Sequence, residues 1–145
     1  MLEITLRPVQ EVELGTVWQM QQQVFATLRP DQLPFVDSLA QIHWRFRHPQ
    51  NHYDFICLGG QRIGYLQLQR DKTGQRVQIR PLVLLPAFQR RGIGRHVLTL
   101  LEEQTPGIEI WRANLPSSSA ALALFAKQGY RQLRPGHWQK TRDQI

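Results

Sequence analysis

The 145-residue sequence has a single cysteine, no long apolar run and no block of consecutive like charges. Because Cys57 stands alone, a disulfide within the chain is excluded. No apolar run approaches the roughly 20 residues that a membrane-spanning helix needs. The first residues, MLEITLRP, also lack the charged and apolar regions of a signal peptide. These absences predict a cytoplasmic protein with no membrane segment.

Acidic residues are also scarce, with 11 Asp and Glu against 18 Lys and Arg, so the formal net charge is +7. Such a charge favours anionic partners, and most of the cations are arginine, which binds phosphate in bidentate geometry. The basic residues are spread over most of the chain rather than clustered, which argues against a nucleic-acid-binding module. The remaining candidates are phosphorylated cofactors, acidic substrates and a membrane surface.

Length and hydrophobicity predict a folded globule. Hydrophobic residues make up 41% of the sequence, and we find no internal repeat and no low-complexity linker. A chain of this length suits one domain that buries about 70% of its unfolded surface. We therefore expect a single domain over residues 1–145.

Hydrophobic periodicity predicts strands and helices along the whole chain. Strands are expected over residues 3–7, 53–58, 62–69, 75–85, 107–113, 130–133 and 137–141. Helices are expected over residues 9–28, 39–46, 92–104 and 120–128. The order is β-α-α-β-β-β-α-β-α-β-β, which is typical of a mixed α/β or α+β sheet with helices on both faces.

Capping residues and one proline refine these elements. Asp37 or Ser38 is expected to cap the second helix. Pro81 lies inside the long strand over residues 75–85, where it cannot donate to a ladder, so a bulge or a local splitting is expected there. Three serines are candidate caps of the last helix: Ser117, Ser118 and Ser119.

The stretch FQRRGIGRHVL, residues 88–98, places two glycines and three arginines where a helix begins. A helix macrodipole already carries positive charge at this end, and each added cation costs roughly 0.3–1 kcal/mol unless an anion is present. Glycines let a ligand approach the backbone and leave N–H groups free to point at it. The stretch therefore predicts an anion-binding turn at a helix N-terminus.

Two well-known anion-binding motifs do not fit this spacing. A Rossmann fingerprint needs a glycine where Val97 stands, three residues after Gly94. A P-loop needs four residues between its glycines, followed by lysine and serine or threonine. Neither dinucleotides nor nucleoside triphosphates are supported.

The segment QRRGIG, residues 89–94, resembles the Q/R-x-x-G-x-G/A signature of the GNAT superfamily of N-acetyltransferases. Pro86 follows an apolar strand where that family often has proline, and ALALFAKQGYRQL, residues 121–133, is similar to its Y-x-x-x-G-F helix and strand. The order of elements agrees over almost the whole chain. The resemblance implies a GNAT-like fold with a central, mostly antiparallel sheet flanked by helices.

The resemblance also implies acetyl-CoA as co-substrate, without a metal. Backbone amides from Gln89 through Gly94 and the start of the helix would bind its pyrophosphate, the arginines would assist or reach the ribose phosphate, and two strand residues would pair with the pantetheine. Where relatives often have asparagine, this chain has Ser118, with Asn114 nearby. The cofactor-binding residues so implied are Leu84, Leu85, Gln89, Arg90, Arg91, Gly92, Ile93, Gly94, Arg95 and Ser118.

The catalytic residues stay unassigned. Where many relatives carry a tyrosine acid this chain has Phe125, and the long strand presents Gln78 and Arg80 but no carboxylate. An acceptor ammonium must lose a proton before it attacks the thioester. Direct attack with proton transfer through water, or a base from elsewhere, remains open. The candidate bases are Glu109, Asp31, Asp37, His43 and Tyr65.

The acceptor is expected to enter from the segment over residues 28–52, which contains Phe35, Trp44 and Phe46. We predict that Trp44 and Phe46 belong to the core, as do Tyr130 and an inert Cys57. The histidines His48 and His52 lie on either side of Pro49, which breaks any helix that would align them, so no metal site is expected.

Three functions follow from these observations. The first is transfer of an acetyl group from acetyl-CoA to a primary amine of an unidentified acceptor. The second is a catalytically degenerate CoA-binding regulator of the same fold, suggested by Phe125 and the missing carboxylate. The third, a basic nucleic-acid-binding module, is disfavoured by the scattered charges. A homodimer through an exposed sheet edge stays open.

Overall fold

The structure is a computed structural model that describes residues 3–33, 36–116, 118–119 and 121–144. Within these residues seven strands form one sheet in the order β1-β2-β3-β4-β5-β7-β6. Neighbouring strands are antiparallel except β4 and β5, which are parallel, so the predicted mixed and mostly antiparallel sheet is confirmed. The strands are β1 (Ile4–Pro8), β2 (Asn51–Leu58), β3 (Gln61–Arg70), β4 (Arg76–Leu84), β5 (Ile110–Asn114), β6 (Arg131–Arg134) and β7 (His137–Thr141).

The helices interrupt the strands in the predicted order. They are α1 (Leu14–Phe25), α2 (Leu39–Phe46), α3 (Ile93–Gln104) and α4 (Leu122–Lys127), with short 3-10 turns η1 (Glu11–Glu13), η2 (Pro30–Gln32), η3 (Pro86–Phe88) and η4 (Arg142–Gln144). The first helix is shorter than predicted. At its start Glu13 accepts a hydrogen bond from the Gln10 amide, which favours the 3-10 turn, and after its end the Thr27 hydroxyl donates to the Val24 carbonyl.

Ser38, and not Asp37, caps α2. Its hydroxyl accepts a hydrogen bond from the Gln41 amide at 3.1 Å, and the Gln41 side chain accepts from the Ser38 amide at 2.8 Å. This reciprocal capping box satisfies two backbone donors that the helix itself leaves free. At α4 the Ser119 hydroxyl accepts from the Ala121 amide, whereas the candidate cap Ser117 lies outside the described residues.

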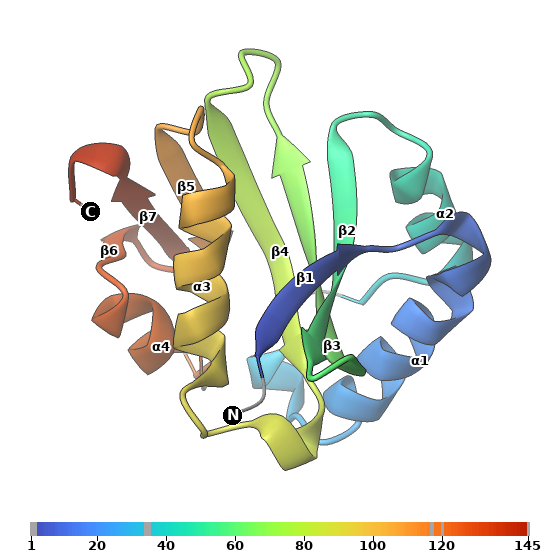
Figure 1. Cartoon of the computed structure of the whole chain (residues 1–145). Coiled ribbons are helices and arrows are strands. Elements are labelled where there is room, and N and C mark those ends of the chain that lie inside the picture. The colour runs from blue at the N-terminus through green and yellow to red at the C-terminus, as the bar shows by residue number, and fades with distance from the viewer. Residues whose placement is uncertain (1–2, 34–35, 117, 120, 145) are drawn as a thin grey trace.

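The sheet separates two hydrophobic cores. α3 and α4 pack on one face, and α1 with α2 pack on the other (Figure 1). Strand alternation explains the division, because successive side chains point to opposite faces: Ile56 lies under α3, while Phe55 and Cys57 lie under α1. Cys57 and Tyr130 are buried, which confirms their predicted core positions.

The predicted core position of Trp44 is wrong, because 57% of its surface is exposed. In the short helix α2 the inward position belongs to Ile42, and Trp44 instead packs on His48 with ring centroids 3.9 Å apart. Phe46, by contrast, packs against the core under α1, as predicted.

β4 and β5 separate where Pro81 interrupts the long strand. They pair only over Arg76–Ile79 and Ile110–Ala113. Against β3, the register passes from Leu68 opposite Ile79 to Leu66 opposite Leu82, so β4 carries one extra residue at this point. The bulge and the splitting predicted from Pro81 are both confirmed. The resulting gap lies beside the first turn of α3, where the site described below is found.

None of the helices in the described parts of the chain combines the length and apolar character needed to cross a lipid bilayer.

Candidate functional site

A cavity of about 850 Å³ occupies the gap between β4 and β5. Five elements form its wall: the second half of β4, the end of β5, the turn into α3, the end of α1, and α4. The bulge in β4 creates this space, because it turns the strand away from β5 and leaves their peptide groups unpaired.

The turn before α3 has a backbone suited to presenting N–H groups. Arg90 and Gly92 adopt left-handed conformations, with φ of 61° and 77°. Within the described chain, the backbone amides of residues 90–95 donate to no other protein group, whereas the Gln89 amide, which was also expected to bind the ligand, donates to the Pro86 carbonyl at 3.3 Å. Six consecutive free donors at a helix N-terminus form an anion-binding site, since the macrodipole adds positive potential there.

Glycine is favoured at Gly92 and at Gly94 for different structural reasons. A Cβ at Gly92 would meet nothing within 4 Å, so its positive φ is what favours glycine. A Cβ at Gly94 would approach Leu124 Cδ2 to 2.8 Å, so Gly94 lets α3 pack closely on α4.

The charged lining of the cavity is cationic. Arg80, Arg90, Arg95 and Lys127 contribute to the wall, and among the residues that the structure describes no aspartate or glutamate does. Arg91 does not line it; its guanidinium lies 5.7 Å from the centre of the Phe88 ring. Two further residues were predicted to bind the cofactor. Gln89 lines the cavity, whereas the Ile93 side chain packs against the core under α3.

Of the two predicted strand residues, Leu84 faces the cavity and Leu85 does not. The Leu85 amide donates to the Ile63 carbonyl of β3 at 2.8 Å, so it is already occupied. Antiparallel pairing alternates, and the peptide groups of Leu84 and Leu82 therefore point away from β3 toward the gap. Leu82 was missed by sequence analysis, although the two-residue period of a strand would have found it. The Gln89 side chain donates to the Leu84 carbonyl at 2.8 Å.

Ser118 points away from the cavity. Its hydroxyl donates to the Asp31 carboxylate at 2.9 Å and lies 3.1 Å from the Asp31 carbonyl oxygen. This hydrogen bond, together with Arg29, holds the pKa of Asp31 below its usual value. In the described residues the wall includes Ser119 and Asn114 but not Ser118, whose contact instead joins η2 to the loop before α4.

Phe125 lines the cavity and is buried. Its ring meets that of Tyr130 edge-on, with centroids 4.9 Å apart. The Tyr130 hydroxyl is buried without a hydrogen-bond partner in the described chain, and burial raises the pKa of this phenol well above its ordinary value. Neither ring therefore supplies an accessible proton donor at this wall.

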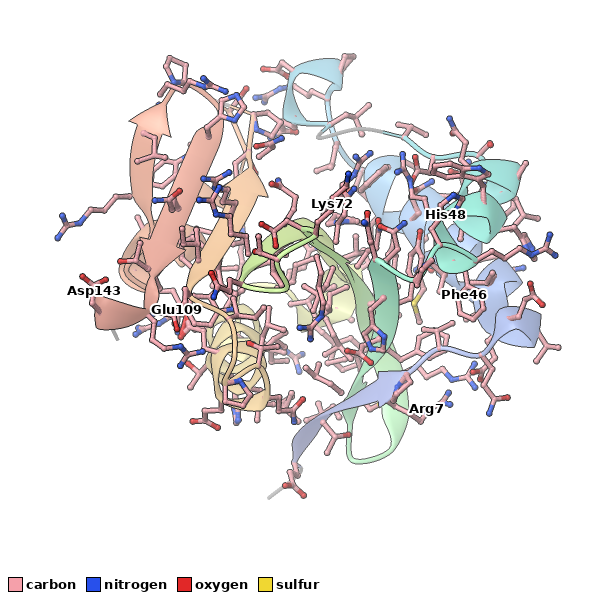
Figure 2. The ribbon with its side chains drawn as sticks, turned by 90° about the horizontal axis from the view of Figure 1, so that it is seen from above. Arg7, Phe46, His48, Lys72, Glu109 and Asp143 are labelled. Atoms are coloured by element: carbon pink, nitrogen blue, oxygen red, sulfur yellow. The ribbon has the colours of Figure 1, made fainter. Side chains whose placement is uncertain are left out.

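Two of the candidate bases lie elsewhere. The Glu109 amide donates to the Gln75 carbonyl, at the end of β4 opposite the cavity, and Figure 2 shows Glu109 beside Asp143, on the far side of the molecule from α2. His43 lines a separate, open hollow of about 540 Å³ on the outer surface of α2.

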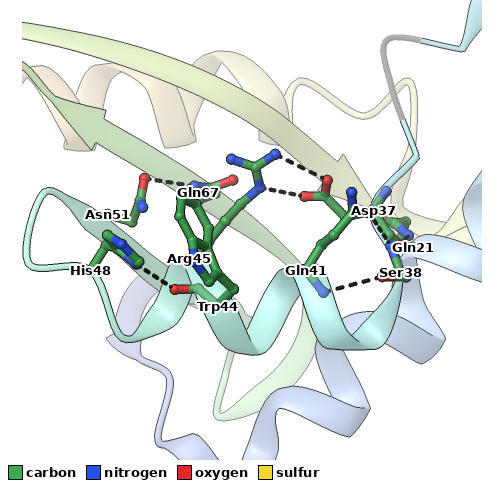
Figure 3. Close-up of polar contacts among 9 residues, drawn as sticks. All are labelled: Gln21, Asp37, Ser38, Gln41, Trp44, Arg45, His48, Asn51 and Gln67. Atoms are coloured by element: carbon green, nitrogen blue, oxygen red, sulfur yellow. Dashed lines mark hydrogen bonds and ion pairs between the residues drawn. The ribbon is translucent and has the colours of Figure 1, made fainter.

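The other candidates are occupied or protonated. Asp37 is 4% exposed and binds the Arg45 guanidinium through both oxygens, at 2.9 and 3.3 Å (Figure 3). Gln21 donates to the Asp37 carbonyl at 2.7 Å, which fixes the residue against α1. Burial raises the pKa of Tyr65 and of Tyr53 far above the ordinary value, so both phenols stay protonated. Asp31 is held by Arg29 and Ser118.

No metal centre accompanies the cavity: within the described parts of the chain, His, Cys, Asp and Glu side chains nowhere gather in threes that would hold an ion.

Comparison with known proteins gives one family. Residues 16–130 match the model of the "Acetyltransferase (GNAT) family". The N-alpha-acetyltransferase RimI of Mycobacterium tuberculosis (strain ATCC 25618 / H37Rv) is 31% identical over 87 residues, or 59% of this chain. The match spans about half of that relative, 55% of its length.

Solved structures share the fold. An aminoglycoside acetyltransferase in complex with coenzyme A superimposes with a TM-score of 0.79 at 16% identity, over 97% of this chain and 96% of that one. An acetyltransferase from Thermus thermophilus gives a TM-score of 0.77 at 19% identity, over 97% of each chain.

Proposed function

The chain belongs to the GNAT acetyltransferase family, and from this premise we propose that it transfers the acetyl group of acetyl-CoA to a primary amine. One observation carries the proposal: free backbone amides over residues 90–95 border a cavity opened by the separation of β4 and β5. The first feature suits a pyrophosphate, and the second suits an extended pantetheine arm. The bound coenzyme A of the aminoglycoside acetyltransferase, which has the same fold, agrees with this assignment.

In the proposed complex the turn into α3 binds the pyrophosphate of acetyl-CoA. The amides of residues 90–95 donate to its oxygens, and the macrodipole of α3 adds attraction. Arg90, Arg95 and Lys127 line the same cavity and supply countercharge. We propose that Arg91, which lies beside Phe88, reaches the ribose phosphate.

The edge of β4 is proposed to bind the pantetheine as an added strand. Leu82 and Leu84 present their peptide groups to the gap, since neither pairs with β3 through them. The side-chain amide of Gln89 donates a hydrogen bond to the Leu84 carbonyl. We expect an incoming pantetheine N–H to replace this side chain as the donor. Leu85 and Ser118 take no direct part, because their donors are bound to Ile63 and Asp31.

The proposed chemistry is direct attack on the thioester. The neutral amine forms the C–N bond, the C–S bond breaks, and its electron pair leaves on sulfur. A free backbone N–H of β4 would hold the oxyanion, and a donor of this kind is worth roughly 3–4 kcal/mol in comparable sites. Since the described wall contains no carboxylate, histidine or tyrosine, the ammonium proton passes to water.

The experiment is a binding measurement followed by an assay. Acetyl-CoA at about 100 times its dissociation constant should stabilise the fold by about 2.7 kcal/mol and raise the melting temperature by several degrees. Thiol release with a panel of primary amines then tests transfer. An unchanged melting temperature would overturn the proposal. Binding without thiol release for any amine would favour a degenerate, regulatory relative.

Three broader features belong to the same proposal. We propose that residues 1–145 form one acetyltransferase domain, supported by a single sheet with a core on each face. We propose a cytoplasmic enzyme, in keeping with one free, buried cysteine. A homodimer through the exposed edge strand β6 stays a prediction that sedimentation would test.

A further inference from the structure

The acceptor side of the cavity carries an excess of positive charge. Val77 and Ile79 of β4 point into the core under α3, so Gln78 and Arg80 lie on the opposite face, toward α1 and α2. Trp111 and Ala113 of β5 alternate in the same way, which puts Arg112 on the face of Gln78, its partner in the parallel register. Arg80 and Arg112 thus lie on the same face of the sheet as the Gln78 side chain, as its neighbours.

Asp37, a carboxylate on this side of the sheet, is already neutralised. Asp37 is buried and bound through both oxygens by Arg45, as Figure 3 shows. Burial, and then the charge of Arg45, lower the pKa of the Arg80 guanidinium, while Asp37 and Tyr53 act to raise it. Arg80 therefore interacts electrostatically with the Arg45–Asp37 pair. The Arg45–Asp37 pair has no net charge, so Arg80 and Arg112 add positive charge to this face of the sheet.

Polar groups at the cavity wall add to the preference of this side for an anion. Gln78 and Arg80 both line the cavity, and the amide nitrogen of Gln78 is buried with no hydrogen-bond partner in the described chain. Arg112 does not line the cavity, and its Nε donates to the neutral Gln139 side chain at 3.0 Å. Among the described residues a polycationic acceptor would meet Arg80 and no carboxylate at this wall, whereas an anion would find the Gln78 amide nitrogen already positioned.

We infer that the acceptor of this enzyme carries a carboxylate as well as its amine, and that Arg80 and Gln78 bind this carboxylate while Arg112 adds attraction. The inference rests on the proposed function and narrows its substrate class. A carboxylate of this kind occurs in a free amino acid and in a peptide whose first residues are acidic. Both present the same chemistry to Arg80, and the test separates the two sources.

The test compares amines that differ in the carboxylate, and each kcat/KM is referred to the concentration of the deprotonated amine, because an α-carboxylate also raises the pKa of the α-amine. One arm pairs L-leucine with L-leucinamide, and the other pairs a peptide amide beginning Ala-Glu-Glu with one beginning Ala-Gln-Gln. Thiol release is measured for each, together with spermidine as a polycation. In at least one arm kcat/KM should favour the carboxylate member by about tenfold or more, as expected for a charge-assisted contact. The arm that responds identifies the source.

Variants connect the preference to its residues. Arg80→Gln should raise KM for the carboxylate acceptor and reduce the preference to within about twofold, and Arg112→Gln should weaken it in the same direction. The matched control is Arg47→Gln, an exposed arginine just after α2 paired with Glu11, which should keep the full preference. The KM for acetyl-CoA separates an acceptor effect from a cofactor effect.

Each remaining outcome is decisive. If neutral members match or exceed their carboxylate partners in both arms, if spermidine is the best acceptor, or if a protein that binds acetyl-CoA turns over neither carboxylate member, the inference is overturned and the cofactor site stands. If both arginine variants keep the preference, its assignment to these residues is overturned. If acetyl-CoA fails to bind, the proposed function itself fails.

Discussion

The ammonium of Lys140 on β7 lies 2.8 Å from the carboxylate of Glu102 on α3, and both side chains are buried. The same ammonium donates to the Gln128 carbonyl at the end of α4, at 2.6 Å. One cation therefore joins a strand and two helices on the face of the sheet that α3 and α4 cover. Glu102 sits near the C-terminus of α3, where a carboxylate opposes the helix dipole; its pairing with Lys140 offsets that cost.

Removing the cation should destabilise the fold strongly. Lys140→Met leaves the Glu102 carboxylate buried without its charge partner, and we expect the free energy of unfolding to fall by roughly 3–5 kcal/mol. Urea denaturation measures this. The control Lys72→Met, at an exposed hairpin position, should change stability by less than about 0.5 kcal/mol. Adding Glu102→Leu to Lys140→Met should recover much of the loss; equal stability of Lys140→Met and the control would contradict a structural role for the pair.

Charge at Gly92 should control cofactor affinity without disturbing the fold. Asparagine and aspartate both tolerate the left-handed conformation, and a side chain at this position meets open space. Gly92→Asp places an anion beside the free amides, whereas Gly92→Asn has the same shape and no charge. We expect Gly92→Asp to bind acetyl-CoA at least about tenfold more weakly than Gly92→Asn in calorimetry.

The comparison between the two Gly92 variants isolates electrostatics, because they share any strain that replacing glycine introduces. Equal affinities, with both variants folded, would show that no anion binds at this turn. Gly94 does not allow such a test, since any Cβ there approaches Leu124 and perturbs the packing of α3 on α4.

The His52–Asp54 pair should make stability depend on pH. His52 Nε2 lies 2.9 Å from Asp54 Oδ1, and this hydrogen bond raises the pKa of His52 above its ordinary 6.5. The folded protein therefore binds the proton more tightly than the unfolded chain. The stabilisation is fully present below pH 6.5 and is lost as pH rises through the raised pKa.

Thermal unfolding of wild type and His52→Gln between about pH 5.5 and about pH 9 measures this contribution. The wild-type advantage should be less than about 1 kcal/mol, because the histidine is half exposed, and it should shrink toward high pH. The control His96→Gln, an exposed histidine on α3, should show no such trend. A wild-type advantage in stability that grows with pH would contradict a raised pKa of His52 in the folded protein.

Local sequence signals predicted the fold well. Pro81 alone predicted a bulge or a local splitting of the long strand, because a proline cannot donate to a ladder, and β4 shows both. Trp44 was misplaced for the opposite reason. On a helix of eight residues the inward face is set by what α2 packs against, and Ile42 takes that position.

The sequence predicted the part of the site that lies in one continuous segment. It did not predict contacts between residues that are far apart in the sequence. Residues 89–94 carry their own signature, and in the described chain the turn there has free backbone amides from residue 90 onward. Ser118 binds Asp31, 87 positions away in the sequence, and no local pattern reveals that contact. The same holds for Arg80 beside the Arg45–Asp37 pair, on which the acceptor inference depends.

The pH dependence of the reaction should follow the acceptor and not the enzyme. In the described residues no carboxylate, histidine or tyrosine lines the cavity, Asp37 is bound by Arg45, and burial raises the pKa of Tyr65 far above its ordinary value. Without a base, only the deprotonated acceptor reacts, so kcat/KM should rise about tenfold per pH unit and level off at the pKa of the amine. A peptide α-amine, with a pKa of about 7.7–8.0, and a lysine ε-amine, at about 10.4, would break at different pH values. Measuring both profiles for acceptors that turn over decides the matter, because a break at one shared pH would mean that the enzyme itself supplies the base.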